Sequence, residues 1–292
     1  MLKKLSILEI ENVYTAHAFA TDEGFFVGAG SETGSQVKLY NVANKSIENV
    51  PDCPGGMMSF IPVPGKPWTF VTIMGLFPPF IGGEAGLYLH QLSGKDWTTK
   101  KAMDLPFAHR CEFLQNRGGS VLVAATVSKL KENPADWSRP GELHVVSMER
   151  NSSLPWKSEV IDSGITRNHG MAKASLGGEE LLLVSGDKGI FSIQARHGQT
   201  WEVNAVFEKE VSEMTFIDLD GDGTNELVTI EPFHGDTMNI YKKTDKGWEK
   251  KFMDSLSFGH GLSGGIFNKE PIIIAGNRSD SLSLVSYKVC LL

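Results

Sequence analysis

The chain has 292 residues, 41% of them hydrophobic, and a formal net charge of −7 at pH 7. This length can bury a large core, and the absence of a lysine or arginine run argues against nucleic acid as a partner. No window approaches the roughly 20 apolar residues of a membrane span, and residues 1–10 lack the apolar stretch of a signal peptide. We therefore expect no membrane partner and a cytoplasmic protein, which the three cysteines without metal-binding spacing also favour.

Short apolar segments recur along the chain, each bounded by Gly, Pro or Asp. They are residues 25–29, 69–73, 121–125, 181–185, 226–230 and 271–275. Each is followed by a segment of alternating polarity: 36–40, 86–90, 142–146, 189–193, 237–241 and 281–285. Short apolar runs predict buried strands, and alternation predicts strands with one buried face.

The repeating unit is thus a first strand, a buried strand, an alternating strand and an outer strand. Six units in 292 residues give about 49 residues each, a length typical of a four-stranded propeller blade. We predict an all-β, six-bladed β-propeller of antiparallel blades, a single domain over residues 1–292. A strand at residues 5–13 is expected to complete the last blade and close the ring. The alternative is a two-domain sandwich, and the six-fold count argues against it.

The segment 216–230 carries the sharpest local motif. Asp218, Asp220 and Asp222 stand two residues apart on a glycine-rich turn, and Glu226 follows. Hard oxygen ligands at alternating positions suit Ca²⁺. The flanking segments are typical of strands rather than of the helices of an EF-hand, so we predict a structural calcium loop between two strands. The alternative is an acidic turn that is exposed to solvent and binds no calcium.

Histidines recur at one place in the repeat. Four of the eight stand where the first strand of a unit is expected to begin: His17, His109, His169 and His260. First strands line the central channel of a propeller, so we expect these imidazoles to converge at one mouth of it. At the same place the second unit has Met57-Met58 and the fifth has Ser212-Glu213.

The same face is expected to carry the two longest loops, 75–84 and 128–141, as lids or binding loops. Further polar side chains fall beside the histidines or in the loops of this face: Arg110, Trp137, Arg167, Lys188, Glu231, His234 and Arg278. Three interpretations of the histidines stay open. They could bind one transition metal, act as acid–base groups without metal, or bond structurally to neighbouring blades.

The segment 218–226 resembles the FG-GAP/VCBS repeat of β-propellers, and the wider repeat does so over nearly the whole chain. That resemblance implies side-chain ligands to Ca²⁺ at Asp218, Asp220, Asp222 and Glu226, and a carbonyl ligand at Thr224. Only the fifth unit carries the full motif. The segments 108–113, 136–141 and 258–262 look like the propeller part of aldos-2-ulose dehydratase-type proteins, which implies a carbohydrate enzyme that eliminates or isomerises at a keto sugar.

The mechanism to test is proton abstraction next to a sugar carbonyl. A divalent transition metal such as Mn²⁺ or Zn²⁺ on the four histidines would polarise the carbonyl oxygen, and His234 or Glu231 would remove the proton. Arg110 and Arg278 would hold hydroxyl or carboxylate groups, with Trp137, Arg167 and Lys188 as further contacts to a small carbohydrate ligand.

The competing class is a non-catalytic propeller that binds a ligand or a protein and is stiffened by calcium. An exposed apolar run at residues 76–80 would be its partner-binding loop.

Overall fold

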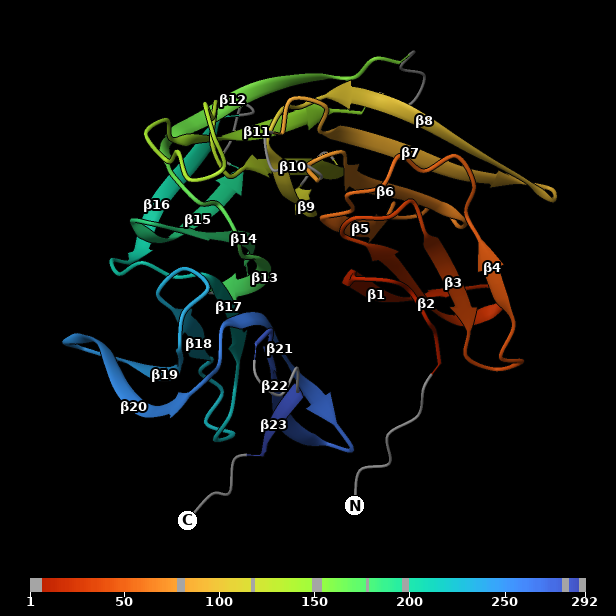
Figure 1. Cartoon of the computed structure of the whole chain (residues 1–292). Coiled ribbons are helices and arrows are strands. Elements are labelled where there is room, and N and C mark those ends of the chain that lie inside the picture. The colour runs from red at the N-terminus through yellow and green to blue at the C-terminus, as the bar shows by residue number, and fades with distance from the viewer. Residues whose placement is uncertain are drawn as a thin grey trace. The chain divides into compact units, whose positions relative to one another are not determined.

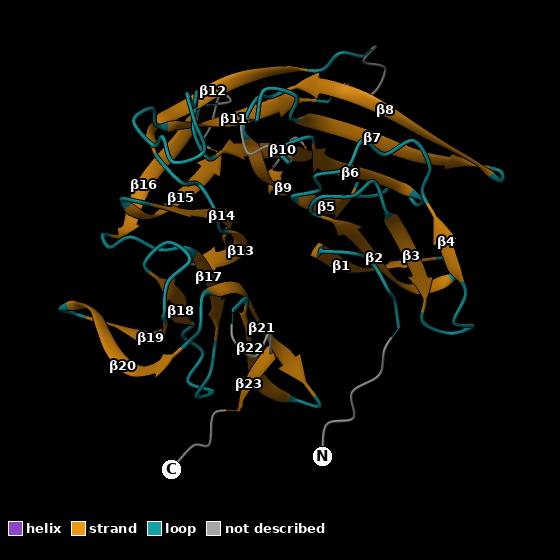
Figure 2. Ribbon diagram, viewed as in Figure 1, coloured by secondary structure: helices purple, strands orange, loops and turns teal. Residues whose placement is uncertain are grey.

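The computed structural model describes residues 7–77, 82–116, 119–148, 154–176, 179–195, 200–279 and 284–288. In these ranges the chain forms strands joined by turns and loops, with no helix (Figure 2). The strands form six antiparallel sheets, five with four described strands and one with three. The predicted fold class, an all-β six-bladed β-propeller, is confirmed. The described residues contain no helix that could cross a membrane.

Two compact units divide the chain, Met1–Ser163 and Gly164–Leu292. The first unit holds three sheets, in each of which strands that are consecutive in sequence are neighbours (Figure 1). Its first sheet consists of β1 (Val13–Thr21), β2 (Gly24–Ser31), β3 (Val37–Asn41) and β4 (Ile47–Asn49). The second consists of β5 (Ser59–Pro62), β6 (Thr69–Met74), β7 (Gly86–Ser93) and β8 (Asp96–Asp104). The third consists of β9 (Ala108–Asn116), β10 (Gly119–Thr126), β11 (Gly141–Ser147) and β12 (Lys157–Ile165), whose last two residues lie past the boundary of the units.

The second unit repeats this pattern. Its first sheet consists of β13 (Met171–Leu176), β14 (Glu179–Gly186), β15 (Gly189–Ala195) and β16 (Trp201–Phe207). The next consists of β17 (Glu213–Ile217), β18 (Glu226–Glu231), β19 (Thr237–Thr244) and β20 (Gly247–Ser255). The last consists of β21 (Gly259–Phe267), β22 (Glu270–Asn277) and β23 (Leu284–Lys288).

The second strand of each sheet contains the apolar segment found in the sequence. Every residue of β6 is buried, as expected for a strand covered on both faces. In the first unit, Phe70 of this strand packs its ring against those of Phe19, Phe60 and Trp97. In the second unit, Leu183 of β14 belongs to a buried cluster with Leu227 and Tyr241. Burial of these side chains supplies the main driving force for assembling the sheets.

Gly189 stands at a turn where no larger residue fits. Gly189 begins β15 with φ of +120°, a backbone conformation that other residues rarely adopt. A Cβ atom there would lie 1.9 Å from the carbonyl oxygen of Phe207 in β16. The turn between β14 and β15 therefore requires glycine for both its backbone angle and its close approach to β16.

The exposed apolar run predicted at residues 76–80 and the closing strand predicted at 5–13 differ from the structure where their residues are described. Leu76, predicted to be exposed, is completely buried, and residues 78–81 lie outside the described residues. Residues 7–12 form no strand, and Val13 already belongs to β1. The described part of the predicted closing strand, residues 7–12, is therefore not a strand, and residues 5 and 6 lie outside the described ranges. The single domain over 1–292 stays a prediction.

Candidate functional site

A β-bulge marks the beginning of the first strand in several sheets. The pairing with the second strand shifts by one residue around Tyr14 in β1, around His109 in β9 and around His260 in β21. Just before β13, His169 and Gly170 both bond to the backbone of Ser185, which is the same two-against-one arrangement. Bulges re-aim side chains at strand ends. They give His109, His169 and His260 equivalent positions, as the sequence predicted.

The alignment of His17 with these three histidines was wrong. In the first sheet Tyr14 holds the bulge position, and His17 lies three residues further along β1, opposite Gly28. The bulge is revealed only by the register of β1 against β2, in which Val13 pairs with Ser31 and Thr15 with Gly30. His17 and His109 belong to the first unit, so the convergence of all four imidazoles stays a prediction.

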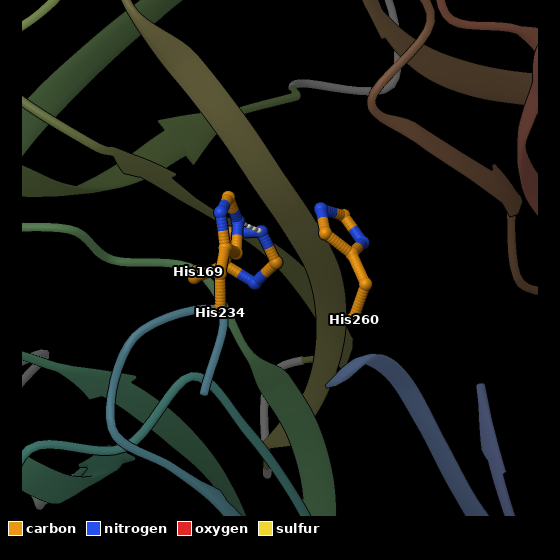
Figure 3. Close-up of side chains that lie close together, drawn as sticks. All are labelled: His169, His234 and His260. Atoms are coloured by element: carbon orange, nitrogen blue, oxygen red, sulfur yellow. Dashed lines mark hydrogen bonds between the residues drawn. The ribbon is translucent and has the colours of Figure 1, made fainter. Parts of the chain in front are cut away.

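Three histidines of the second unit form a compact cluster. The ring nitrogens that His169, His234 and His260 offer lie within 4.8 Å of one another. The Nε2 atoms of His169 and His234 are 3.1 Å apart, and the ring centroids of His234 and His260 are 4.5 Å apart (Figure 3). A tetrahedral Zn²⁺ site separates its ligand nitrogens by about 3.3 Å, given Zn–N bonds of about 2.0–2.1 Å. The offered nitrogens span up to 4.8 Å in this structure, so the rings would have to move closer together to hold one ion.

Each imidazole of this cluster comes from a different sheet of the second unit. His169 precedes β13, His234 lies in the loop between β18 and β19, and His260 is the second residue of β21. His234 has φ of +50°, in the left-handed region that is uncommon for residues other than glycine. Left-handed residues of this kind gather at functional sites, where the surrounding structure holds them in place.

A carboxylate lies close to the most buried imidazole. Glu213 Oε1 lies 2.7 Å from His169 Nδ1, and the two residues are 8% and 2% exposed. The carboxylate favours a proton on Nδ1, which leaves a lone pair on Nε2 of His169. His234 then donates its Nε2–H across the 3.1 Å contact. A carboxylate on the far nitrogen of a histidine is the arrangement that metal sites use to fix the ring and strengthen the ligand.

The third imidazole is held neutral. Burial lowers the pKa of His260 to about 2, and the neighbouring His169 and His234 add to the shift. The guanidinium of Arg278 lies with Nη1 3.0 Å from His260 Nε2, and it donates to this nitrogen because only the imidazole has a lone pair there. A neutral imidazole is the form that binds a metal ion.

Aromatic and cationic groups border the cluster. The ring of Phe233 stacks on His234 at a centroid distance of 4.0 Å. The guanidinium of Arg167 lies 5.1 Å from the centroid of the Phe233 ring, with Nη1 2.6 Å from Glu210 Oε1. The structure therefore brings the predicted contact residue Arg167 close to the histidines of its unit through Phe233.

Two other predicted residues of this unit lie elsewhere. The carboxylate of Glu231 accepts hydrogen bonds from the hydroxyl groups of Thr229, at 2.5 Å, and Tyr241, at 3.2 Å. Lys188 is exposed in the two-residue turn between β14 and β15. Neither position tests the roles predicted for them, which stay predictions.

In the first unit, His109 forms a polar cluster of its own. Its Nε2 lies 2.9 Å from the hydroxyl oxygen of Tyr14. Arg110 places its guanidinium 5.4 Å from the centroid of the Tyr14 ring and donates to the carbonyl of Met58. The two bulge side chains of β1 and β9 thus meet within this unit.

Trp137 lies in the long loop between β10 and β11, also in the first unit. The ammonium of Lys131 sits 3.3 Å from the centroid of its ring and donates to the carbonyl of Pro134. One face of the indole is therefore already covered by a side chain of the same loop. The predicted contact between Trp137 and a ligand stays a prediction.

The acidic loop lies between β17 and β18, as the sequence predicted. Carboxylate oxygens of Asp218, Asp220 and Asp222 lie within 4.8 Å of one another. Asp218 accepts hydrogen bonds from the amides of Gly221 and Gly223, at 2.7 and 2.9 Å, so the turn is held in shape by its own backbone. Both glycines have positive φ, 76° and 84°.

The fourth carboxylate of this loop completes an oxygen-rich donor set. Glu226 is 4% exposed, and its Oε2 accepts from the amide of Leu219 at 2.8 Å. Its Oε1 accepts no hydrogen bond from the described residues. Burial raises the pKa of Glu226. This oxygen lies 3.5 Å from the ammonium of Lys242. A buried carboxylate beside three aspartates fits a cation site, and oxygen donors of this kind suit Ca²⁺.

Sequence reasoning missed two polar residues beside the histidines. Glu213 could have been found, because it stands in the fifth unit at the place where other units carry histidine. Tyr14 could not, because its equivalence to His109 depends on the bulge in β1. Both are polar side chains aimed by the first strand of a sheet.

No protein-family model matches the chain, and no curated protein matches it significantly. The resemblance to FG-GAP/VCBS repeats therefore stays a prediction. Solved structures do match over most of the chain. A luciferin-regenerating enzyme is 12% identical with a TM-score of 0.56, over 93% of this chain and 86% of that one.

A functionally unknown protein from Desulfotomaculum acetoxidans DSM 771 is 13% identical with a TM-score of 0.61, over 94% and 83% of the two chains. The PQQ-bound aldose sugar dehydrogenase of Streptomyces coelicolor is 8% identical with a TM-score of 0.54, over 95% and 94%. Identities this low show that the fold is shared and nothing more. The similar structures include enzymes by name, and function on a shared fold depends on the site.

Proposed function

We propose that this protein binds one divalent transition metal on His169, His234 and His260 and acts on a small carbohydrate next to a carbonyl group. The reaction would be that of a lyase, a dehydratase or an isomerase. The observation that supports this proposal is the cluster itself: three imidazoles from the elements of three sheets, one of them neutral and one with a buried carboxylate beside it. Imidazole suits Zn²⁺ and other first-row metals.

The metal would supply Lewis acidity toward the carbonyl oxygen of the substrate. His169 is kept in the tautomer that presents Nε2 by Glu213, and His260 presents Nε2 once Arg278 releases it. Arg278 is then available for a carboxylate or hydroxyl group of the substrate. Phe233 and Phe258, the latter 42% exposed, offer apolar ring faces beside His234 for stacking.

His234 would act either as the third ligand of the metal or as the base that accepts the proton of the substrate, and the two roles can be distinguished. It comes from a loop, whereas the other two imidazoles come from or adjoin first strands. A substitution separates the roles. If His234→Gln retains the metal and loses turnover, His234 is the base; if the metal is lost as well, His234 is a ligand.

The test begins with the metal alone. The purified protein is loaded with Zn²⁺ or Mn²⁺, freed of excess, and analysed for metal content. We expect about one ion per chain, lost in His169→Ala and His260→Ala and kept in His90→Gln. His90 is a matched control because its ring bonds only to Thr72 and Thr99 among the described residues. Turnover of keto sugars and uronates is then measured with the loaded protein, and turnover unaffected by His169→Ala would exclude the proposed site.

A second, structural role is supported by the acidic loop. We infer that Ca²⁺ is held by Asp218, Asp220, Asp222, Glu226 and the carbonyl of Thr224, and that it stiffens the blade of β17–β20. The supporting observation is the donor set: carboxylate oxygens of Asp218, Asp220 and Asp222 lie within 4.8 Å of one another, and Glu226, 4% exposed, belongs to the same loop. Millimolar Ca²⁺ should raise the Tm of chelator-treated protein, and Asp220→Asn should remove the effect. A propeller that binds ligands without catalysis would show this calcium response and no turnover.

A further inference from the structure

A lysine side chain already occupies the acidic loop. The ammonium of Lys242, from β19, lies 2.7 Å from Asp222 Oδ2 and 3.5 Å from Glu226 Oε1, and it also contacts Asp220 Oδ2. One ammonium thus bridges three of the four carboxylates of the proposed calcium site. Its side chain is only 25% exposed.

We propose that Lys242 is the built-in cation of this loop, and that Ca²⁺ binds only by displacing its ammonium. The displacement of the ammonium by Ca²⁺ rests on the calcium site proposed above. An ammonium within about 4 Å of a divalent ion is repelled by it, while both are attracted by the same carboxylates. Lys242 therefore sets the calcium affinity of the loop and replaces the ion when calcium is scarce.

The sheet explains why this lysine reaches the loop. Tyr241 pairs with Leu227, so Lys242 lies across from Glu226, where β18 leaves the loop. Side chains alternate along a strand, and the next residue, Lys243, points the other way and places its ammonium 4.9 Å from the centroid of the Trp248 ring. Lys243 is a matched control: the same residue type on the same strand, outside the acidic loop.

The loop keeps its shape around the ammonium. Asp218 bonds to the amides of Gly221 and Gly223, and Asp222 Oδ1 accepts from the amide of Thr224 at 2.8 Å. These bonds leave Asp220, the second oxygen of Asp222 and Glu226 Oε1 directed at one cation. A lysine ammonium is a compact point charge on a flexible stem, so it can enter and leave this position.

The experiment compares Ca²⁺ binding by calorimetry in the native protein, Lys242→Met, Lys242→Arg and Lys243→Met. Removing one positive charge beside a divalent ion should tighten calcium binding roughly tenfold or more. We expect this gain in Lys242→Met alone. Lys242→Arg keeps the charge and should bind as weakly as the native protein. Equal affinity in the native protein and Lys242→Met would overturn the proposal.

Thermal unfolding without calcium gives an independent readout. Lys242→Met should have a lower Tm than Lys243→Met in chelator, because its carboxylates lose their only cation among the described residues, and Ca²⁺ should restore it. If neither protein binds calcium at millimolar concentration, the calcium site fails, yet a lower Tm for Lys242→Met still supports Lys242 as the resident cation. Equal Tm values in chelator would refute that role. Should Lys242→Met fail to fold without calcium and fold with it, the proposal is supported directly.

Discussion

The substitution Glu213→Gln tests the metal centre most directly. The glutamine keeps the shape of the side chain and an oxygen that can accept from His169 Nδ1, but it removes the negative charge. In the native protein that charge lies 2.7 Å from the ring, and the two residues are 8% and 2% exposed. Solvent and salt screen a pair this buried only weakly. The change therefore isolates the electrostatic support of one ligand.

The expected magnitude follows from the geometry. Loss of a carboxylate partner behind a metal-bound histidine weakens metal binding by about 10- to 100-fold, or roughly 1.4–2.7 kcal/mol. Because glutamine still orients the ring, Glu213→Gln should fall near the lower end of this range. Glu213→Ala also loses the orientation and should fall near the upper end.

The assay is competition between the protein and a chelator for Zn²⁺, with Tm measured on the metal-free proteins as a check on folding. Glu210→Gln is the control, because Glu210 pairs with Arg167 at 2.6 Å and belongs to the same unit. We expect native-like affinity in Glu210→Gln. If Glu213→Gln bound Zn²⁺ as tightly as the native protein and Glu210→Gln do, the assignment of Glu213 as the positioning residue of His169 would be refuted.

Three further predictions concern stability. Burial lowers the pKa of His90 from 6.5 to about 4, so the unfolded chain binds a proton at higher pH than the folded protein does. The free energy of unfolding should therefore fall by about 3 kcal/mol as the pH drops from 6.5 to 4. Urea unfolding of His90→Gln over the same pH range should show a smaller loss. Gly189→Ala should cost more than the strain of about 1–3 kcal/mol expected for Gly119→Ala, since only Gly189 faces the Phe207 carbonyl, and equal unfolding midpoints would contradict this. Phe70→Ala, at 1% exposure, should lower the free energy of unfolding by about 3–5 kcal/mol, and a loss below about 1 kcal/mol would show that its ring cluster does not hold the sheets.

Much of the fold was readable from the sequence because strands repeat with a two-residue period. The apolar segments at 69–73 and 181–185 lie within β6 and β14, and the alternating segments at 86–90 and 237–241 lie within β7 and β19. The acidic loop was placed correctly for the same reason, since both its flanks have strand patterns. The histidine positions of the fourth and sixth units followed from counting along the repeat.

The sequence failed where a position depends on local geometry or on a cross-strand neighbour. The bulge of β1 lies at Tyr14, three residues before His17, so Tyr14 rather than His17 takes the place that His109 has in β9. His234 was predicted as a base and not as a member of the histidine cluster. No sequence pattern shows that the ring of this loop residue lies against His169. Lys242 gave no signal either, because only strand pairing brings it to Glu226.

The sequence by itself determined the blades, the acidic turn and the recurrence of polar residues at the start of first strands, because each is encoded in residues that are near one another in the chain. Tertiary structure alone decided which of those polar groups touch. The contacts of Glu213 with His169 and of Lys242 with Asp222 join residues 44 and 20 positions apart, over distances of 2.7 Å that only the packed sheets can set.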